Sequence, residues 1–157
     1  MTRYGIGPKF FIITMLTGVI AGWLTYLFPD LFRLSFIPFW IFAATGAVLL
    51  VTGFLVYAVS LKFFIRGFSK GHLVVEGPYS VVRHPIYASW IFLIFPGIAL
   101  FFQSWLMLSV PAAAYLSFKA FIRKEDRDLE KSFAAAYLDY RSKVNELLPG
   151  RRYEQNK

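Results

Sequence analysis

One stretch of this 157-residue chain places a fixed cation, an imidazole and phenols directly before a long uncharged segment. A proline follows the cation and the imidazole, and proline is well suited to the first turn of a helix. A helix that begins there presents free backbone N–H groups and the positive end of its dipole, which together favour an anionic ligand. The stretch therefore predicts a ligand site at a helix N-terminus. Its candidate residues are Tyr79, Arg83, His84, Pro85 and Tyr87.

A second group of candidates is the pair of adjacent acids Glu125 and Asp126, at the start of a predicted helix. Glu125 precedes Leu129 by four residues, so the two side chains share the apolar face of that helix. A carboxylate turned inward beside a membrane is costly unless it is paired or used. Asp126 precedes Phe133 by seven residues and lies near the edge of the same face. The pair is therefore a candidate for ligand binding.

Each group also has an ordinary structural interpretation. Arg83 can anchor the chain at the cytoplasmic membrane surface, where basic residues accumulate, and the tyrosines can form an interfacial aromatic belt. Glu125 and Asp126 can serve to stabilise the first turn of a helix, a position that favours acidic residues. The residues alone leave both interpretations open.

The composition excludes several other kinds of site. The chain has no cysteine, which removes disulfides, thiolate metal ligands and thiol nucleophiles together. Two histidines without a cysteine argue against a zinc site, and we expect no metal. The sequence contains no glycine-rich nucleotide-binding motif and no nucleophile elbow. Any cofactor pocket must therefore be built from helix ends and loops.

The overall composition is that of a small integral membrane protein. Hydrophobic residues make up 57% of the chain and charged residues 17%, with a mean hydropathy of +0.54. Seven of the nine acidic residues lie from Glu125 onward, so one end of the chain is polar. This distribution excludes a soluble two-domain enzyme, a disordered tail protein and a nucleic-acid-binding module. The net charge of +8 fits the enrichment of basic residues in cytoplasmic loops.

The uncharged segments predict an all-α membrane protein with four spans in a single domain. The segment 86–118 carries no charge and is too long for one span, so we expect a hairpin that turns at Gln103 and Ser104. Pro96 and Pro111 should kink or break its helices. Apolar residues recur at helical spacing in the tail, which predicts an amphipathic cytoplasmic helix. The expected spans are about 10–28, 36–61, 86–102 and 105–122, followed by the helix 123–149, within one membrane domain, 1–157.

The basic residues predict the orientation of these spans. With four spans, 16 of the 17 Lys and Arg residues fall on the side of the N-terminus, the 62–85 loop and the C-terminal tail. Arg33 alone falls on the other side. Because basic loops stay in the cytoplasm, both termini are expected there. The two groups of candidate residues then share the cytoplasmic face.

Taken together, the two groups resemble the isoprenylcysteine carboxyl methyltransferase family and its bacterial relatives, with phospholipid N-methyltransferases as more distant kin. The family's first motif is G-x-Y-x-x-x-R-H-P-x-Y. After a hairpin comes an E-E-x-x-L-x-x-x-F-G-x-x-Y-x-x-Y helix and a short V…P end. The resemblance covers about residues 71–149, half of the chain. The matching residues are Gly77, Tyr79, Arg83, His84, Pro85, Tyr87, Glu125, Leu129, Phe133, Tyr137, Tyr140, Val144 and Pro149.

This chain departs from the family pattern at three positions. Ser89 and Ala134 stand where the family has glycine, and Asp126 replaces the second glutamate. The first two changes add bulk where backbones or a cofactor approach closely. They bear on the fine shape of the pocket.

The resemblance implies methyl transfer from S-adenosylmethionine to a lipophilic acceptor, an isoprenylcysteine-like carboxylate or similar. That cofactor carries a sulfonium, an amino group, a carboxylate and ribose hydroxyls, so its pocket needs both signs of charge. By analogy Glu125 accepts hydrogen bonds from the cofactor, and Arg123, or alternatively Arg83, orients the substrate. The cofactor-lining residues implied are His72, Leu73, Val74, Val75, Tyr79, His84, Pro85, Ile86, Tyr87, Glu125 and Asp126.

Two other functions remain open at this point. Membrane sterol or enone reductases that use a nicotinamide cofactor carry a related R-H-x-x-Y-like stretch, and a membrane scaffold that has lost activity would also retain the pattern. The expected partners are membrane lipids and a lipophilic small-molecule or lipid substrate, without nucleic acid or metal. We expect the protein in a bacterial or archaeal cell membrane.

Overall fold

The structure, a computed structural model, describes residues 6–150 and residue 153. These residues form helices and connecting turns and contain no β-strand, which confirms the predicted all-α class. In chain order the elements are α1 (Gly7–Leu27), α2 (Pro29–Phe32), α3 (Phe39–Lys70), the 3-10 helix η1 (Gly77–Ser80), α4 (Pro85–Ser89), the π-helical turn η2 (Trp90–Ile94), α5 (Phe95–Phe101), the 3-10 helix η3 (Trp105–Leu108) and α6 (Ser109–Lys143).

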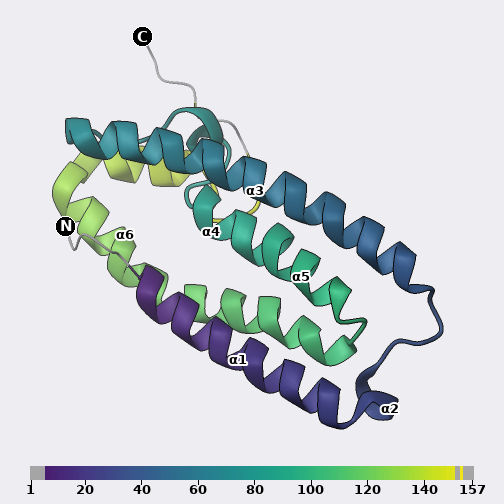
Figure 1. The fold of residues 1–157 in the computed structure, drawn as a ribbon. Coiled ribbons are helices and arrows are strands. Elements are labelled where there is room, and N and C mark those ends of the chain that lie inside the picture. Colours follow the sequence, from purple (N-terminus) through teal and green to yellow (C-terminus); the bar gives the residue numbers. More distant parts are fainter. Residues whose placement is uncertain (1–5, 151–152, 154–157) are drawn as a thin grey trace.

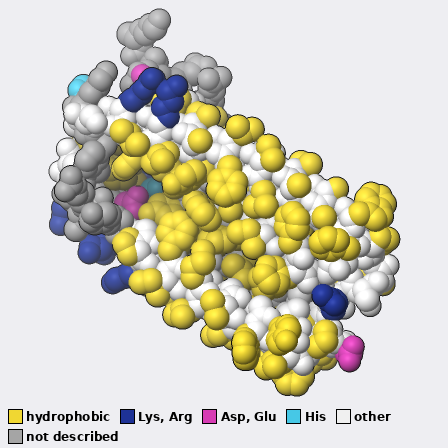
Figure 2. Space-filling view, in the orientation of Figure 1, with side chains coloured by type: hydrophobic (Ala, Val, Ile, Leu, Met, Phe, Trp, Pro, Cys, Tyr) yellow, Lys and Arg dark blue, Asp and Glu magenta, His cyan; other side chains and the backbone are white. Residues whose placement is uncertain are grey.

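Three helical segments are long and apolar enough to cross a membrane, namely Gly7–Leu27, Phe39–Gly67 and Trp105–Lys143. Many of their large apolar side chains face outward, as shown by Val19 and Leu55, which are 69% and 63% exposed. Figure 2 shows such side chains covering the length of the bundle. A contiguous apolar surface of this extent fits a lipid environment. The protein is therefore an integral membrane protein.

The segment Pro85–Phe101 is a shorter apolar helix that combines α4, η2 and α5. Pro96 lies in the first turn of α5, directly after the π-helical turn. A proline has no N–H to donate to the preceding turn, and a local π-helical turn is one way in which a membrane helix accommodates it. The expected disturbance at Pro96 is thus local. Pro111 lies in the first turn of α6, where a missing N–H breaks no hydrogen bond.

Helix α6 differs from the expected arrangement of a span, 105–122, followed by a separate helix, 123–149. It begins at Ser109, continues without interruption past residue 122, and ends at Lys143. No glycine or proline occurs between residues 112 and 143 to end it earlier. The helix instead bends at Ala134, which has φ 43° and ψ −121°. The helix therefore has no break at 122–123, and it ends at Lys143, before the expected end at 149.

The bundle packs its helices side by side, with the α4–α5 helix between α3 and the first part of α6, and α1 along α6 (Figure 1). A buried aromatic core joins these helices, and Phe10, Phe95 and Phe118 are at most 2% exposed. Gly46 of α3 and Gly97 of α5 allow a close approach, because a Cβ on Gly46 would lie 2.9 Å from the Gly97 carbonyl oxygen.

The predicted turn at Gln103 and Ser104 is present and closes one end of the bundle. Gln103 has a φ of 46°, and its carbonyl oxygen accepts the N–H of Leu34 at 2.7 Å. The Ser104 hydroxyl is 2.8 Å from that of Thr25, and Ser104 pairs with Arg33 in an isolated bridge. The end of α5 therefore lies beside the end of α1.

Candidate functional site

The motif residues Arg83 and His84 lie directly before α4, at the end of the bundle opposite the Gln103 turn. The preceding turn begins at Gly77, whose φ of 60° is a conformation that glycine adopts without strain. Pro85 then opens α4, as the sequence predicts. Arg83 and His84 are 8% and 5% exposed. A buried guanidinium requires anionic partners, and Asp126 of α6 and Glu146 beyond α6 supply them.

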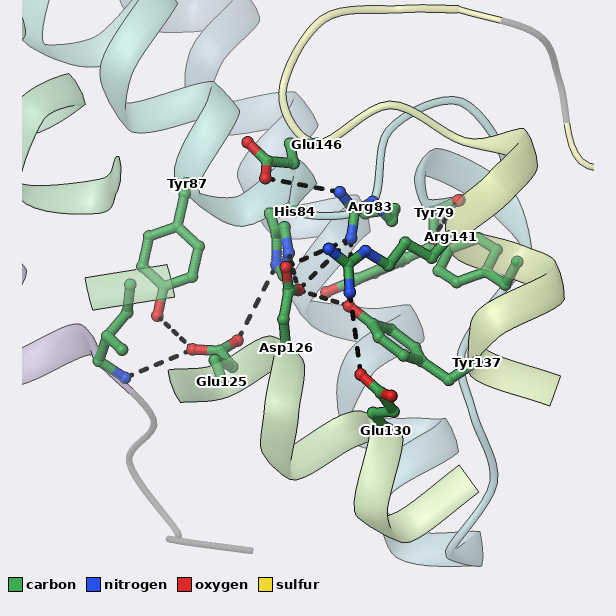
Figure 3. Close-up of polar contacts among 12 residues, drawn as sticks. Tyr79, Arg83, His84, Tyr87, Glu125, Asp126, Glu130, Tyr137, Arg141 and Glu146 are labelled. Carbon is green, nitrogen blue, oxygen red and sulfur yellow. Dashed lines mark hydrogen bonds and ion pairs between the residues drawn. The ribbon is translucent and has the colours of Figure 1, made fainter. Parts of the chain in front are cut away.

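Asp126 is the centre of a buried polar cluster (Figure 3). Both of its carboxylate oxygens lie 3.4 Å from Nη1 of Arg83, and Oδ1 lies 3.2 Å from Nε2 of His84. The Tyr137 hydroxyl donates to the same oxygen. A carboxylate that is 5% exposed is stabilised there by this combination of an opposite charge and hydrogen bonds. Asp126 thus ties α6 to the start of α4.

Glu125 faces the other side of the His84 ring. One of its oxygens is 4.0 Å from Nδ1 of His84, and the other accepts from the Tyr87 hydroxyl at 3.3 Å. The latter oxygen also accepts the backbone N–H of Ile6 at 3.4 Å. The two adjacent acids therefore flank both ring nitrogens of one imidazole. Glu125 retains 25% exposure of its side chain, in contrast to Asp126.

A cavity of about 530 Å³ opens beside this cluster. Figure 2 shows acidic and histidine side chains within a hollow near this end of the molecule, framed by hydrophobic side chains. One wall of the cavity is polar and carries both signs of charge, while the other is made of aromatic and aliphatic side chains. The polar wall includes His72, Tyr79, Arg83, His84, Tyr87, Lys124, Glu125 and Asp128, and the apolar wall includes Ile6, Phe11, Tyr57, Leu61, Phe64, Leu129 and Phe133.

Tyr79 is a neutral hydrogen-bonding group in this cavity. Burial raises the pKa of its phenol well above the usual value, and the neighbouring Tyr140 and Glu125 raise the pKa further. The Tyr140 hydroxyl donates to the backbone carbonyl of Tyr79 at 2.6 Å. At neutral pH the Tyr79 hydroxyl is therefore a potential donor to a ligand and does not act as a base.

Most of the predicted site residues lie around the same cavity, but four of them do not line it. Val75 packs in a separate cluster with Tyr137 and Tyr140. Pro85 is buried at the start of α4, and Asp126 lies behind Arg83 and His84. Arg123 is exposed and is not among the lining residues. The nine predicted residues that do line the cavity are His72, Leu73, Val74, Tyr79, Arg83, His84, Ile86, Tyr87 and Glu125.

The part of the apolar wall that comes from α1 and α3 was not identified from the sequence. Phe11 comes from α1, while Tyr57 and Leu61 come from α3. These residues are indistinguishable in the sequence from lipid-facing aromatic and aliphatic residues, because no pattern indicates which helices pack together. Tyr137 and Tyr140 could be identified from the sequence, because they belong to the apolar face of the tail helix and match the second motif.

The three departures from the family pattern have different surroundings. The Ser89 hydroxyl is 1% exposed and donates to the carbonyl of Ile86 at 2.7 Å, so the extra polar group is satisfied within its own helix. Asp126 is the centre of the buried cluster. Ala134 has the positive φ at which glycine is favoured.

Among the described residues, no group of three or more His, Cys, Asp or Glu side chains is arranged to hold a metal ion.

Comparison with known proteins gives one match. The model of the phospholipid methyltransferase family matches residues 35–136, which is more than half of the chain. The matched region includes all of α3, α4 and α5, and it continues along α6 to Ala136, just past the bend at Ala134. No curated protein and no solved structure matches the chain.

Proposed function

Because the chain belongs to the phospholipid methyltransferase family, we propose that it transfers a methyl group from S-adenosylmethionine to a lipophilic acceptor at the cytoplasmic membrane face. The observation that carries this proposal is the cavity that joins a charged wall to an apolar wall. Its volume of about 530 Å³ lies within the range of about 300–1,000 Å³ that is usual for small-molecule sites.

The residues around the cavity fit the functional groups of the cofactor. S-adenosylmethionine supplies an electrophilic methyl group on a sulfonium and also carries an amino group, a carboxylate and ribose hydroxyls. Glu125 and Asp128 provide anionic acceptors, whereas Arg83 and Lys124 provide cations on the same wall. The Tyr79 hydroxyl adds a neutral donor. Glu125 is the residue expected to accept from the amino group or the hydroxyls.

The chain's own residues contribute positioning and exclusion of water, the main contributions expected for a methyl displacement. Phe11, Tyr57 and Leu61 form an apolar surface against which a lipophilic acceptor can lie. A carboxylate acceptor needs no base, because it is ionised near pH 7. An amine or thiol acceptor would pass its proton to His84, whose Nδ1 has the longer of the ring's two carboxylate contacts.

Of the two arginines considered for orienting the acceptor, Arg83 is the better placed. It lines the cavity, whereas Arg123 is exposed and does not. The Arg83 guanidinium is held by Asp126 and Glu146, so its charge has a fixed position beside the cavity. We therefore assign the acceptor-orienting role to Arg83.

The membrane topology that we propose has four spans with both termini in the cytoplasm. Pro85–Phe101 begins at the cavity and ends beside the Gln103 turn, which supports a full crossing although the helix is short. The carbonyl of Gln103 accepts from Leu34, on the far side of the bundle from the cavity. In the sequence, 16 of the 17 Lys and Arg residues fall in the N-terminal segment, the 62–85 loop and the C-terminal tail, which this topology leaves on one side of the membrane, and this distribution supports the cytoplasmic assignment.

The test is equilibrium binding of S-adenosylmethionine to the detergent-purified protein, with the Glu125→Ala variant alongside. Loss of a hydrogen bond to a charged group costs about 1.5–3 kcal/mol, so we expect the affinity to fall by about tenfold or more. Glu130→Ala is the matched control, because Glu130 pairs with Arg141 at 3.8 Å and is not among the cavity-lining residues. It should retain wild-type affinity.

Three results would contradict the proposal in different ways. Unchanged affinity in a folded Glu125→Ala variant would remove Glu125 from the site. Binding of NADPH in place of S-adenosylmethionine would favour the reductase. Binding of neither compound to folded protein supplied with its membrane lipids would favour the inactive scaffold. After binding is established, lipophilic acids, amines and thiols can be screened as acceptors with labelled methyl donor.

A further inference from the structure

The chain beyond α6 returns to the motif at the start of α4. Val144 is extended, with φ −117° and ψ 129°, and residues 144–147 then run beside Arg83 and His84. The Arg83 N–H donates to the carbonyl of Asn145 at 2.8 Å, and the His84 N–H donates to the carbonyl of Glu146 at 3.0 Å. Both amides belong to buried residues that precede a helix, where acceptors within the helix are absent. We call residues 144–147 the C-terminal strap.

The C-terminal strap is anchored at both ends by apolar side chains. Val144 is 2% exposed and packs with Val75, Tyr137 and Tyr140. Leu147 is 6% exposed and belongs to the main hydrophobic core. Burying two aliphatic side chains contributes about 1.5–3 kcal/mol each. The contact is therefore an integral part of the fold, although it lies beyond residue 136, where the family match ends.

Between these anchors, the Glu146 carboxylate contacts cations from two elements. Its Oε1 lies 3.6 Å from Nη2 of Arg83 (Figure 3). Its Oε2 forms an ion pair with Nζ of Lys119 on α6. Arg83 is thereby held between Glu146 on one side and Asp126 on the other. Without Glu146, the guanidinium would be drawn fully towards Asp126, whose Oδ1 is shared with His84.

From this arrangement we propose that Glu146 is a positioning residue of the ligand site, acting through Arg83, and that the C-terminal strap holds the Arg83–His84 backbone in its binding geometry. The inference rests on the proposed function where it concerns S-adenosylmethionine. Glu146 is not among the residues that line the cavity, so its effect on a ligand is indirect. The role is specific, because Glu146 contacts the guanidinium of Arg83, which lines the cavity.

The first experiment compares S-adenosylmethionine affinity of the full-length protein with those of Glu146→Gln, Glu146→Asp and Glu130→Gln. We expect Glu146→Gln to weaken binding about tenfold or more, as for residues that orient a ligating side chain. Glu146→Asp retains the charge and should recover most of the affinity. Glu130→Gln makes the same chemical change in an exposed Arg141 pair and should have no effect. Wild-type affinity in Glu146→Gln, or an equal loss in the control, would overturn the positioning role.

The second experiment needs no cofactor and therefore separates this inference from the proposed function. Leu147→Ala removes an anchor of the C-terminal strap, whereas Leu148→Ala changes a neighbouring side chain that is 61% exposed. Hydrogen–deuterium exchange of the peptide that contains Arg83 and His84 should accelerate at least several-fold in the first variant and stay unchanged in the second. Unchanged exchange in Leu147→Ala would overturn the proposed role of the C-terminal strap even if the cofactor binds. Accelerated exchange in a protein that binds no cofactor would support the role of the C-terminal strap and contradict the proposed function.

Discussion

At the scale of single residues, the site depends on how two neighbouring acids divide their contacts. Asp126 is buried and satisfies Arg83, His84 and the Tyr137 hydroxyl, whereas Glu125 stays partly exposed at the cavity wall. The difference follows from their positions on α6, since successive residues of a helix point about 100° apart. The Asp126 carboxylate therefore contacts other protein side chains, whereas the Glu125 carboxylate remains accessible to a ligand.

The strained backbone of Ala134 leads to a testable prediction at the residue scale. Its φ of 43° with ψ of −121° is unfavourable for any residue with a Cβ, and such strain costs about 1–3 kcal/mol. We expect Ala134→Gly to relieve this strain and raise stability by about 1 kcal/mol, after allowance for the greater freedom of glycine in the unfolded chain. The measurement is the thermal unfolding midpoint in detergent.

Ala136→Gly provides the control for this prediction. Ala136 is exposed in the helical segment beyond the bend, so glycine there should lower stability by about 0.5–1 kcal/mol. The two substitutions make the same change two residues apart and are expected to have opposite signs. A fall in the midpoint for Ala134→Gly similar to that of the control would show that position 134 is not strained.

At the scale of elements, the site is formed by the start of α4, the long α6 and the ends of α1 and α3. The bend at Ala134 turns the last part of α6 so that Tyr137 and Tyr140 line the cavity. A straight helix would carry these tyrosines away from Tyr79 and Arg83. The length of α6 beyond the membrane segment and its bend are therefore both required by the site.

The contact between α3 and α5 supports a second prediction. A Cβ on Gly46 would lie 2.9 Å from the carbonyl oxygen of Gly97 and 2.9 Å from the Phe101 ring. The backbone of α5 must shift to accept it, so we expect Gly46→Ala to destabilise the protein by about 1–3 kcal/mol. Thermal unfolding in detergent measures this change.

Gly18 on α1 is the matched control, because a Cβ there would meet Val110 at 3.8 Å, an ordinary van der Waals distance. Gly18→Ala should be neutral or slightly stabilising, since alanine is the better helix former. If both alanine variants unfold at the wild-type temperature, the close approach of α3 and α5 is not needed for stability.

At the scale of the whole molecule, the two ends of the bundle differ in character. One end carries the cavity with Arg83 and Lys124, and the other carries the Gln103 turn beside Arg33. The charged wall of the cavity lies at the end that we propose to be cytoplasmic, from which the proposed cofactor would bind. The apolar wall borders the lipid-facing helices, from which a lipophilic acceptor would enter.

The absence of cysteine allows a direct test of this topology. Ser35 and Ser142 are exposed at opposite ends, and a single cysteine at either position has no background from other thiols. We expect Ser35→Cys to react with a membrane-impermeant maleimide in intact cells. Ser142→Cys should react only after the membrane is permeabilised. The reverse pattern would contradict the orientation, and labelling of both in intact cells would contradict the number of spans.

The sequence by itself determined the helical class, the membrane environment and most residues of the polar wall, but not Lys124 and Asp128. These features are local, because uncharged runs follow from the thickness of the bilayer, and the spacing of Tyr79, Arg83, His84 and Glu125 matches a known pattern. The tertiary structure decided which helices pack together and therefore supplied Phe11 and Tyr57 as the opposite wall. It also decided the bend in α6 and the return of Glu146 to Arg83. These contacts join residues far apart in the chain, and their selection depends on packing that no short pattern encodes.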